Sequence, residues 1–381
     1  MRILVLNYEF PPLGGGAAPV SRDIAVQLSK KGHNVTVVTM GYQELPTYEE
    51  MHAVKIYRLK CIRRKKSSCM PWEQYTYLLA VRRFIKEHMK THTYDVCHVH
   101  FVIPTGEAAA WIHKRYGLPY VITAHGSDVE GYNQKKYMKI MHRLLRPAWR
   151  KIVDCSEGVV APSAYLQNLM QSRHARGKYI FIPNGLDIAK YVQLAQSGNK
   201  EKNILLMCRL QRYKNVQTIL RAMARVDLSG WTVDILGDGP FRVELEKLSS
   251  ELGLGSYVKF HGWIDNGSAK QMRHLKKASV YITASYFENC PMAVIETIAS
   301  GCYPLLSDIP AHRQLVSGDE YYFAADDVQG LADRLRAVIS KSGEISTGEI
   351  DVSKYDWENV MSQYEEVLFQ VSGKGNGEKR C

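Results

Sequence analysis

Short apolar segments alternate with helical segments along nearly the whole chain, and this alternation restricts the possible folds more than any other feature. Strands are expected at residues 3–5, 35–38, 95–99, 120–123, 159–161 and 179–182, and again at 204–208, 232–236, 258–261, 280–283 and 303–307. Helices are expected between them, for example at 19–31, 105–115 and 268–277. Strands that are separated by helices form parallel sheets covered on both faces. The sequence therefore predicts an α/β protein.

The length of the chain predicts two domains. Its 381 residues exceed one ordinary hydrophobic core and suit two domains of roughly 150–200 residues each. The polar segment 189–202, AKYVQLAQSGNKEK, is predicted to be the linker between them. We expect an N-terminal Rossmann-like domain at 1–187, a C-terminal Rossmann-like domain at 188–355, and a final helix with a flexible tail at 356–381.

The composition argues against several classes of protein. No apolar run reaches about 18 residues, so no membrane-spanning helix is expected. The N-terminal sequence MRILVLNYEF is typical of a first strand and not of a secretory signal. The eight cysteines are scattered and form no Cys-x-x-Cys pair. This pattern favours a reducing cytoplasm and argues against a disulfide framework or a zinc site.

The net charge of +12 lies almost entirely in the first half. Residues 1–185 contain 27 Lys and Arg against 13 Asp and Glu, whereas the remainder contains 23 against 25. A basic domain beside a nearly neutral one indicates an anionic partner on one side only, which could be an anionic lipid, a phosphorylated acceptor or a nucleic acid. The basic loop 60–68 is either a solvated surface or a membrane contact.

Residues 135–151 form a basic segment without any acid. On a helix, Lys136, Lys139, Arg143, Arg146 and Arg150 lie on one face, and Met138, Met141, Leu145 and Trp149 lie on another. Pro147 is expected to end one helix and start a second. A helix of this kind either rests on an anionic membrane surface or packs on the protein through its apolar face, and we expect the membrane contact.

Two features of the first half are candidates for ligand binding. Gly14, Gly15 and Gly16 separate the first strand from the first helix, where free backbone N–H groups favour anions or hydroxyls. The alternative is an ordinary tight turn. His125 follows the strand at 120–123 and precedes a glycine, in a position where open α/β sheets bind ligands. A histidine in this place is either structural or functional.

The second half contains paired charges just past the ends of predicted strands. Arg209 and Lys214 follow the strand at 204–208, and two fixed cations there suit a diphosphate. Glu288 follows the strand at 280–283, and Glu296 lies two turns along a helix that begins near Pro291. A carboxylate among apolar neighbours, as at Glu296, needs a partner such as ribose hydroxyls.

Taken together, these segments resemble the retaining glycosyltransferases of family four, which have the GT-B fold. The resemblance is carried by NYEFPPLGGG, GHNVTVVT, TAHGSD and PNGLD, and by RLQRYKN, LGDGP, VKFHGWI and ENCPMAVIETIASGCYP. These motifs span nearly the whole chain and are specific in this order. The resemblance implies two Rossmann-like domains that face each other across a cleft, and a helix from Trp357 that crosses back to the N-terminal domain.

The resemblance also implies a role for each candidate. Glu288 binds the donor sugar and Glu296 the ribose, while the two cations neutralise the diphosphate. The implied catalytic residues are His125, Arg209, Lys214 and Glu288. The implied donor-binding residues are Gly15, Gly16, Arg209, Lys214, Gly237, Trp263, Ile264, Asn289, Cys290, Pro291, Met292 and Glu296. The sequence Asn-Cys-Pro stands where the family often has Gly-Phe-Gly, so the donor preference is not carried over.

The implied activity is retaining transfer of a hexose from a nucleotide diphosphate sugar to a hydroxyl group. The expected acceptor is a glycan or a lipid-linked molecule of envelope polysaccharide or glycolipid synthesis. No Asp-x-Asp motif is present at the diphosphate site, so we expect no metal and no cofactor. The expected location is cytoplasmic and peripheral on the inner face of the membrane, with no nucleic acid as partner. Two alternatives stay open, a sugar-nucleotide epimerase and a non-enzymatic protein that binds nucleic acid or another anion.

Overall fold

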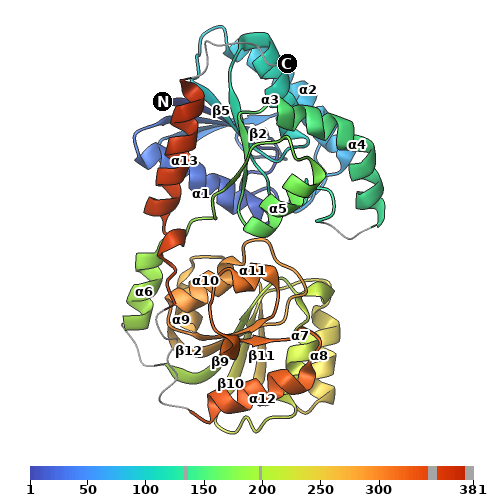
Figure 1. Cartoon of the computed structure of the whole chain (residues 1–381), viewed down its shortest axis with the longest axis vertical. Helices are drawn as coiled ribbons and strands as arrows, with labels where there is room; N and C mark the ends of the chain where they lie inside the picture. The colour runs from blue at the N-terminus through green and yellow to red at the C-terminus, as the bar shows by residue number, and fades with distance from the viewer. Residues whose placement is uncertain (133–135, 197–199, 342–349, 374–381) are drawn as a thin grey trace. The chain divides into compact units, whose positions relative to one another are not determined.

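The computed structural model describes residues 1–132, 136–196, 200–341 and 350–373, and these divide into two compact units (Figure 1). Unit 1 comprises residues 1–185 and the helical segment that begins at Trp357. Unit 2 comprises residues 186–356. Each unit has its own sheet, which is mainly parallel in unit 1 and parallel throughout in unit 2, so the alternation of strands and helices correctly predicts the α/β class.

Unit 1 is built on an eight-stranded sheet with the order β3-β4-β2-β1-β5-β6-β7-β8. All neighbouring strands are parallel except the pair β3 and β4. The strands are β1 (Arg2–Leu6), β2 (Asn34–Met40), β3 (Tyr48–Met51), β4 (Val54–Leu59), β5 (Val96–His100), β6 (Tyr120–Thr123), β7 (Gly158–Ala161) and β8 (Tyr179–Phe181).

Helices cover both faces of this sheet, because alternate residues of each strand point to opposite sides. Leu4 and Leu6 of β1 pack with α2, α3, α4 and α5, whereas Ile3 and Val5 pack with α1 and α13. The helices are α1 (Ala17–Lys30), α2 (Pro71–His88), α3 (Thr105–Tyr116), α4 (Lys136–Asp154), α5 (Ala164–Arg173) and α13 (Trp357–Ser372). The last helix therefore belongs to the core of unit 1, as the resemblance implies.

Unit 2 is built on a six-stranded parallel sheet with the order β11-β10-β9-β12-β13-β14. The strands are β9 (Glu201–Met207), β10 (Thr232–Leu236), β11 (Val258–Gly262), β12 (Ala278–Thr283), β13 (Tyr303–Ser307) and β14 (Tyr322–Phe323). The helices are α6 (Ile188–Gln196), α7 (Val216–Met223), α8 (Arg242–Glu251), α9 (Ala269–Lys277), α10 (Met292–Ala299), α11 (Pro310–Arg313) and α12 (Val328–Ile339). Helices α7, α8 and α12 cover one face, and α6, α9 and α10 cover the other.

Both sheets have a position where the strand order reverses, and such positions form ligand sites at the carboxyl ends of strands. In unit 1, β1 lies between β2 and β5. In unit 2, β9 lies between β10 and β12. The segment that contains Lys214 follows β9, and the segment that contains Glu288 follows β12. These two segments therefore leave neighbouring strands at the same edge of the sheet.

Two predictions of local structure are wrong. Segment 189–202 is not a linker, because α6 occupies most of it and its Tyr191 is buried in the core of unit 2. Pro147 does not end a helix, because α4 continues through it to Asp154. Proline removes one backbone hydrogen bond, and the burial of Trp149, Ile152 and Val153 on the following turn holds the helix together across it.

Several elements were not predicted from the sequence, namely β3, β4, α2, α5, α11 and β14. The cysteines agree only in part with the expectation, because six are free thiols whereas Cys155 is disulfide-bonded. The tail that we expect to be flexible, 374–381, lies outside the described residues, as do Lys135 and the segments 197–199 and 342–349.

Candidate functional site

An ion pair joins the two strand ends at the reversal point of unit 2. The Lys214 Nζ atom lies 2.5 Å from Glu288 Oε1, and the hydroxyl of Ser285 donates to the same oxygen at 2.8 Å. Both charged side chains are largely buried, with 14% and 16% of their surfaces exposed. A short 3-10 turn, Arg212–Lys214, followed by Asn215 in the left-handed conformation, holds the lysine in this position. The carboxylate and the ammonium group therefore fix each other at the strand ends.

The charge state of this pair follows from its surroundings. Burial opposes the charged form of Lys214, but the carboxylate of Glu288, together with Cys208 and Tyr213, raises the pKa of the lysine above its ordinary value. Arg209 differs, because its side chain is exposed and has no hydrogen bond or ion pair with any residue that the structure describes. The site therefore holds one cation in a pair and leaves a second free to meet an anion.

Glu296 lies inside the same unit on α10. Only 6% of the residue is exposed, and its Oε2 atom accepts a hydrogen bond from the side-chain amide of Gln271 at 2.9 Å. Burial raises the pKa of Glu296 to about 7, although Gln271 and the charge of Lys190 act in the opposite direction. A buried carboxyl with one amide donor still has capacity to accept hydroxyl groups.

The segment between the two glutamates leads from β12 into α10. Pro291 is the residue before the helix, and its carbonyl accepts hydrogen bonds from Val294 and Ile295. Asn289 and Cys290 are half-buried, as is Met292 at the first position of the helix. The N-terminus of α10 thus lies in the connection that also contains Glu288, and a helix N-terminus favours negative charge.

Gly237, Trp263 and Ile264 lie past the ends of β10 and β11. Gly237 has a positive φ of +133°, and a Cβ atom there would lie 1.9 Å from the carbonyl oxygen of Cys208. Glycine is thus required because the ends of β9 and β10 come together. Trp263 is 69% exposed, and Ile264 packs against the core of unit 2. All three lie at the same sheet edge as the Lys214–Glu288 pair.

One group in unit 2 has the composition of a metal site. Asp234, His261 and His274 place one ligand atom each within 4.8 Å of one another. The carboxylate of Asp234 already accepts hydrogen bonds from both histidines, at 2.6 and 3.2 Å, and lies 2.6 Å from the Lys277 ammonium group. These donors lower the pKa of Asp234 against the opposing effect of burial. A metal ion at this place must compete with Lys277.

The glycine loop of unit 1 is folded around an acid. Gly14 donates its N–H to the carbonyl of Lys66 at 2.7 Å, and Gly15 donates its N–H to Oε2 of Glu9 at 3.3 Å. The buried guanidinium group of Arg63 donates to the carbonyls of Tyr8 and Lys66. Part of the basic loop 60–68 is therefore a structural support. Because the carboxylate of Glu9 occupies this end of α1, the loop favours a hydroxyl over a second anion.

Gly15 and Gly16 leave open space beside the backbone. No heavy atom lies within 4 Å of a Cβ atom built on either residue. A ligand can therefore approach the main chain closely here, and the binding of a ligand by this loop stays a prediction.

His125 is one member of a histidine cluster. Its Nε2 atom lies 3.1 Å from Nδ1 of His100, and the two rings stack with centroids 5.3 Å apart. The backbone N–H of His125 donates to Oδ1 of Asp128 at 3.1 Å. Burial, with a smaller effect of His98, lowers the pKa of His125 to about 3. The imidazole is therefore neutral near pH 7 and serves as a hydrogen-bonding group, not as a cation.

The cluster continues through His98 to the last helix. The rings of His98 and His100 lie 4.6 Å apart, and His98 Nε2 lies 2.8 Å from the hydroxyl of Thr123. That hydroxyl lies 3.3 Å from the hydroxyl of Tyr364 on α13. His98 and His100 both lie on β5 and are fully buried. The sequence analysis missed them, because a His-x-His pattern in an apolar strand is not by itself a functional signal.

Helix α4 has three sectors in place of the two that the sequence predicts. Trp149 is buried, and Met138 and Met141 are half-buried, so most of the predicted apolar face packs on the protein, whereas its fourth member, Leu145, is exposed. A second apolar stripe is exposed, with Tyr137, Ile140 and Leu144 at 63%, 63% and 75%. Residues spaced by three and four share one face of a helix. The basic residues Lys139, Arg143, Arg146 and Arg150 lie in the sector between the two apolar ones.

None of the described helices combines the length and the apolar character that crossing a membrane requires. The exposed stripe of α4 covers only part of one helix. Such a stripe suits contact with a surface and not insertion through it.

Comparison with protein families gives two matches that follow each other along the chain. The model described as "Glycosyltransferase Family 4" matches residues 14–190. The model described as "Glycosyl transferases group 1" matches residues 164–347. The first match contains the glycine loop, His125 and α4, and the second contains Arg209, Lys214 and both glutamates.

Curated relatives resemble nearly the whole chain. An alpha-monoglucosyldiacylglycerol synthase of Streptococcus pneumoniae is 25% identical, over 87% of this chain and 77% of its own length. A phosphatidyl-myo-inositol mannosyltransferase of Mycobacterium tuberculosis is 27% identical, over 98% of both chains.

Solved structures share the fold. Sucrose-phosphate synthase of Thermosynechococcus elongatus has a TM-score of 0.79 at 18% identity, over 98% of this chain and all of that chain. HepE of Anabaena, solved with UDP and glucose, has a TM-score of 0.71 at 17% identity, over 97% of this chain and all of that chain.

Proposed function

Since the chain belongs to the glycosyltransferases that these two family models describe, we propose that it transfers a hexose from a nucleotide diphosphate sugar to a hydroxyl group of a lipid-linked or glycan acceptor, with retention at the anomeric carbon. The observation that supports this most is the Lys214–Glu288 pair at the reversal point of unit 2. It offers a cation for a diphosphate beside a carboxylate for sugar hydroxyls.

Each candidate of unit 2 has chemistry that fits one part of the donor. Arg209 and Lys214 bind the diphosphate, helped by the N-terminus of α10. Glu288 accepts hydrogen bonds from the sugar hydroxyls, and Glu296 accepts them from the ribose. Gly237, Trp263 and Ile264 border the base, and Asn289, Cys290, Pro291 and Met292 border the sugar and its phosphate.

The proposed reaction needs no protein nucleophile. The bond between the anomeric carbon and the diphosphate oxygen breaks, and its electron pair leaves with the diphosphate. The acceptor oxygen forms the new bond from the same face of the sugar, and its proton passes to the leaving phosphate oxygen. The cations stabilise the charge that develops on the leaving group, which is the main contribution of fixed charges in such reactions.

Unit 1 contributes neutral groups to the proposed reaction. His125 donates or accepts a hydrogen bond at a sugar hydroxyl, since its imidazole is uncharged near pH 7. Gly15 and Gly16 let a substrate approach the backbone. The names of the two curated relatives say that they act on lipids. The exposed apolar stripe of α4, which lies beside the cations of that helix, fits an acceptor held at an anionic membrane surface.

A donor screen tests this function. The protein is mixed with UDP, GDP and ADP in thermal-shift assays, and then with the hexose derivative of the nucleotide that stabilises it. We expect release of the nucleotide only when a lipid or glycan acceptor is present, and a product with the anomeric configuration of the donor. Appearance of an epimer without acceptor, or stabilisation by none of the nucleotides, contradicts the proposal.

A further inference from the structure

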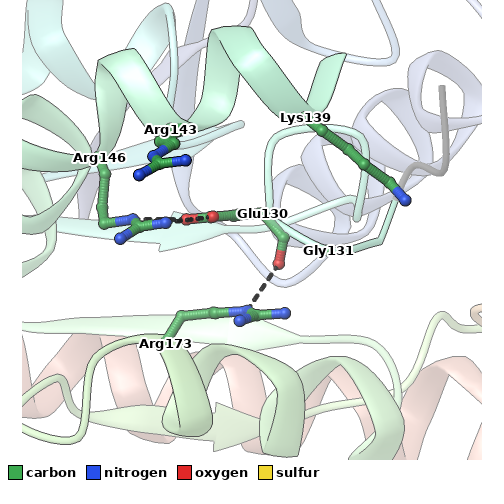
Figure 2. Close-up of a pocket in the computed structure, with 6 residues that line it drawn as sticks. All are labelled: Glu130, Gly131, Lys139, Arg143, Arg146 and Arg173. Carbon is green, nitrogen blue, oxygen red and sulfur yellow. Dashed lines mark hydrogen bonds and ion pairs between the residues drawn. The ribbon is translucent and has the colours of Figure 1, made fainter. Parts of the chain in front are cut away.

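Unit 1 contains a basic pocket that none of the donor-site residues lines. It has a volume of about 450 Å³ and lies between α4, the end of α5 and the segment that follows β6. Its lining residues are Glu130, Gly131, Lys139, Arg143, Arg146 and Arg173. Figure 2 shows Glu130 between Arg146 on α4 and Arg173 at the end of α5, with Arg143 and Lys139 along the α4 side.

Only one of the four cations is neutralised. Arg146 donates to both carboxylate oxygens of Glu130, with Nε 2.7 Å from Oε2, and this contact lowers the pKa of that carboxyl. Arg173 donates to the backbone carbonyl of Glu130 at 3.3 Å and forms no ion pair with a described residue, although its charge also helps to lower the pKa of the Glu130 carboxyl. Lys139 and Arg143 form no ion pair with any residue in the described part of the chain. The pocket therefore has three positive charges in excess.

These charges surround a hollow instead of spreading over a flat surface. A Cβ atom at position 131 would lie 2.7 Å from Nη2 of Arg173, so glycine at this position makes room for the guanidinium group. Guanidinium groups donate in a planar fork that matches phosphate oxygens, and the lysine adds a mobile point charge. The geometry and the charge both fit the oxygens of a phosphoryl group.

The position of the pocket indicates where such an anion comes from. Lys139 and Arg143 lie next in sequence to Ile140 and Leu144, two exposed residues of the apolar stripe on α4. At a membrane surface, phosphate groups lie directly above acyl chains, so a stripe that contacts the chains brings the adjoining pocket to phosphate level. We infer that the basic pocket of unit 1 binds a phosphoryl group carried by an anionic lipid.

This inference rests on the proposed function, because it assigns a headgroup to the membrane contact of that function. It goes further in one respect, since it places recognition in a defined pocket and not in the overall positive charge of unit 1. A bound phosphoryl group would hold α4 against the lipid surface and keep unit 1 beside its acceptor.

The test compares two double variants of the full chain. In the pocket variant, Arg143→Gln and Arg173→Gln are combined. In the control variant, Arg83→Gln and Arg176→Gln remove two exposed arginines of unit 1 that do not line the pocket. Both variants lose the same charge. Their co-sedimentation is measured with vesicles of phosphatidylcholine alone, with added phosphatidylglycerol, and with added oleate at equal surface charge.

We expect the wild type and the control to prefer phosphatidylglycerol vesicles over oleate vesicles, and the pocket variant to lose about tenfold in partitioning to phosphatidylglycerol. Equal losses in the two variants, or equal binding to the two anionic vesicles, would overturn the inference. Calorimetry with glycerol 1-phosphate forms the second arm. If binding of this soluble ligand depends on the pocket while vesicle binding does not, the source is a free phosphate and the lipid assignment is wrong.

Thermal shifts with UDP, GDP and ADP are recorded on the same preparations. The residues proposed for the nucleotide lie in unit 2, so both variants should respond to the nucleotide as the wild type does. A failed vesicle experiment with an intact nucleotide response therefore rejects the pocket alone. If the wild type shows no thermal shift with any of the three nucleotides, the proposed function is rejected instead.

Discussion

The candidate sites of the two units use opposite electrostatic designs. In unit 2, the groups at the reversal point are charged and tied to each other, with Lys214 and Glu288 in a buried pair. In unit 1, the groups that meet where β5 and β6 pair are buried neutral histidines, and three cations without an ion pair to any described residue line the pocket beside α4. This difference matches the two roles in the proposed function, binding of the diphosphate by unit 2 and hydrogen bonding to the sugar by unit 1. Fixed buried charges suit a diphosphate that gains charge during reaction, whereas neutral groups suit sugar hydroxyls that do not.

The substitution Lys214→Ala tests the role of the charged pair in unit 2 and has the largest expected effect. We expect kcat to fall about 100- to 1000-fold, because a preorganised cation at the leaving group is lost. Nucleotide release in the presence of acceptor measures this effect. Lys276→Ala, at an exposed position of α9, serves as the matched control and should leave kcat unchanged. A folded Lys214→Ala protein with normal turnover would show that the pair is only structural.

The second prediction concerns the neutral site of unit 1. His125→Ala should lower kcat by about 10- to 100-fold, since one or two hydrogen bonds to a sugar are lost without loss of charge. The pKa of His125 is near 3, so this side chain does not titrate between pH 5 and 8. The pH–rate profiles of the wild type and of His125→Ala should therefore have the same shape in this range. A pH–rate profile in which His125→Ala removes a step near pH 6.5 would contradict the neutral assignment.

The third prediction concerns the buried carboxyl of Glu296, which, unlike Glu288, has no ion pair with a described residue. Its pKa is higher in the folded protein, about 7, than the ordinary value of 4.5, so the folded state binds more protons between these values. Stability should therefore fall as pH rises from about 4.5 to 7, by about 3 kcal/mol, and stay level above. Urea unfolding of Glu296→Gln should lack this decline.

The same variant should bind the nucleotide about tenfold more weakly at pH 8, because an amide replaces the ionised acceptor for ribose hydroxyls. At pH 6, where Glu296 is mostly protonated in the wild type, the difference should shrink. If the ratio of wild-type affinity to variant affinity for the nucleotide is the same at pH 6 and pH 8, Glu296 lies outside the ribose site.

The smallest expected effect is that of Gly15→Ala. Open space surrounds this position, so the urea midpoint should change little, by the equivalent of less than about 0.5 kcal/mol. KM for one substrate should nevertheless rise about threefold if the ligand contacts the backbone there. Unchanged kinetics would make the loop an ordinary turn and would leave His125 as the main contribution of unit 1.

The sequence was most informative about order along the chain. Apolar runs of three to five residues located the central strands, and the reversal of strand order then brought the segments after β9 and β12 together. It could not reveal that Glu288 is held by Lys214 and Ser285, because these contacts join residues up to 74 positions apart. Nor could it distinguish α6 from a linker, since Tyr191 is the one buried residue of that helix.

The charged helix shows a further limit. The spacing predicted that Lys139, Arg143, Arg146 and Arg150 share one sector of α4, but the composition could not tell which of two apolar stripes packs on the protein. Packing decides this, because Trp149 donates its indole N–H to the carbonyl of Asp128 and so fixes the rotation of the helix. The histidine cluster was missed for a similar reason, since His98, His100 and His125 meet only when β5 and β6 pair.

The return of α13 to unit 1 has a consequence for how the protein is made. Unit 2 is an insertion within unit 1, and its two ends are neighbours, since Leu186 pairs with Asp356 and donates its N–H to Tyr355. During synthesis, unit 2 is complete before α13 leaves the ribosome, while Val360, Met361 and Leu368 are still missing from the core of unit 1. A chain that stops before Trp357 would thus carry a finished unit 2 beside an apolar sheet face open to chaperones and proteases.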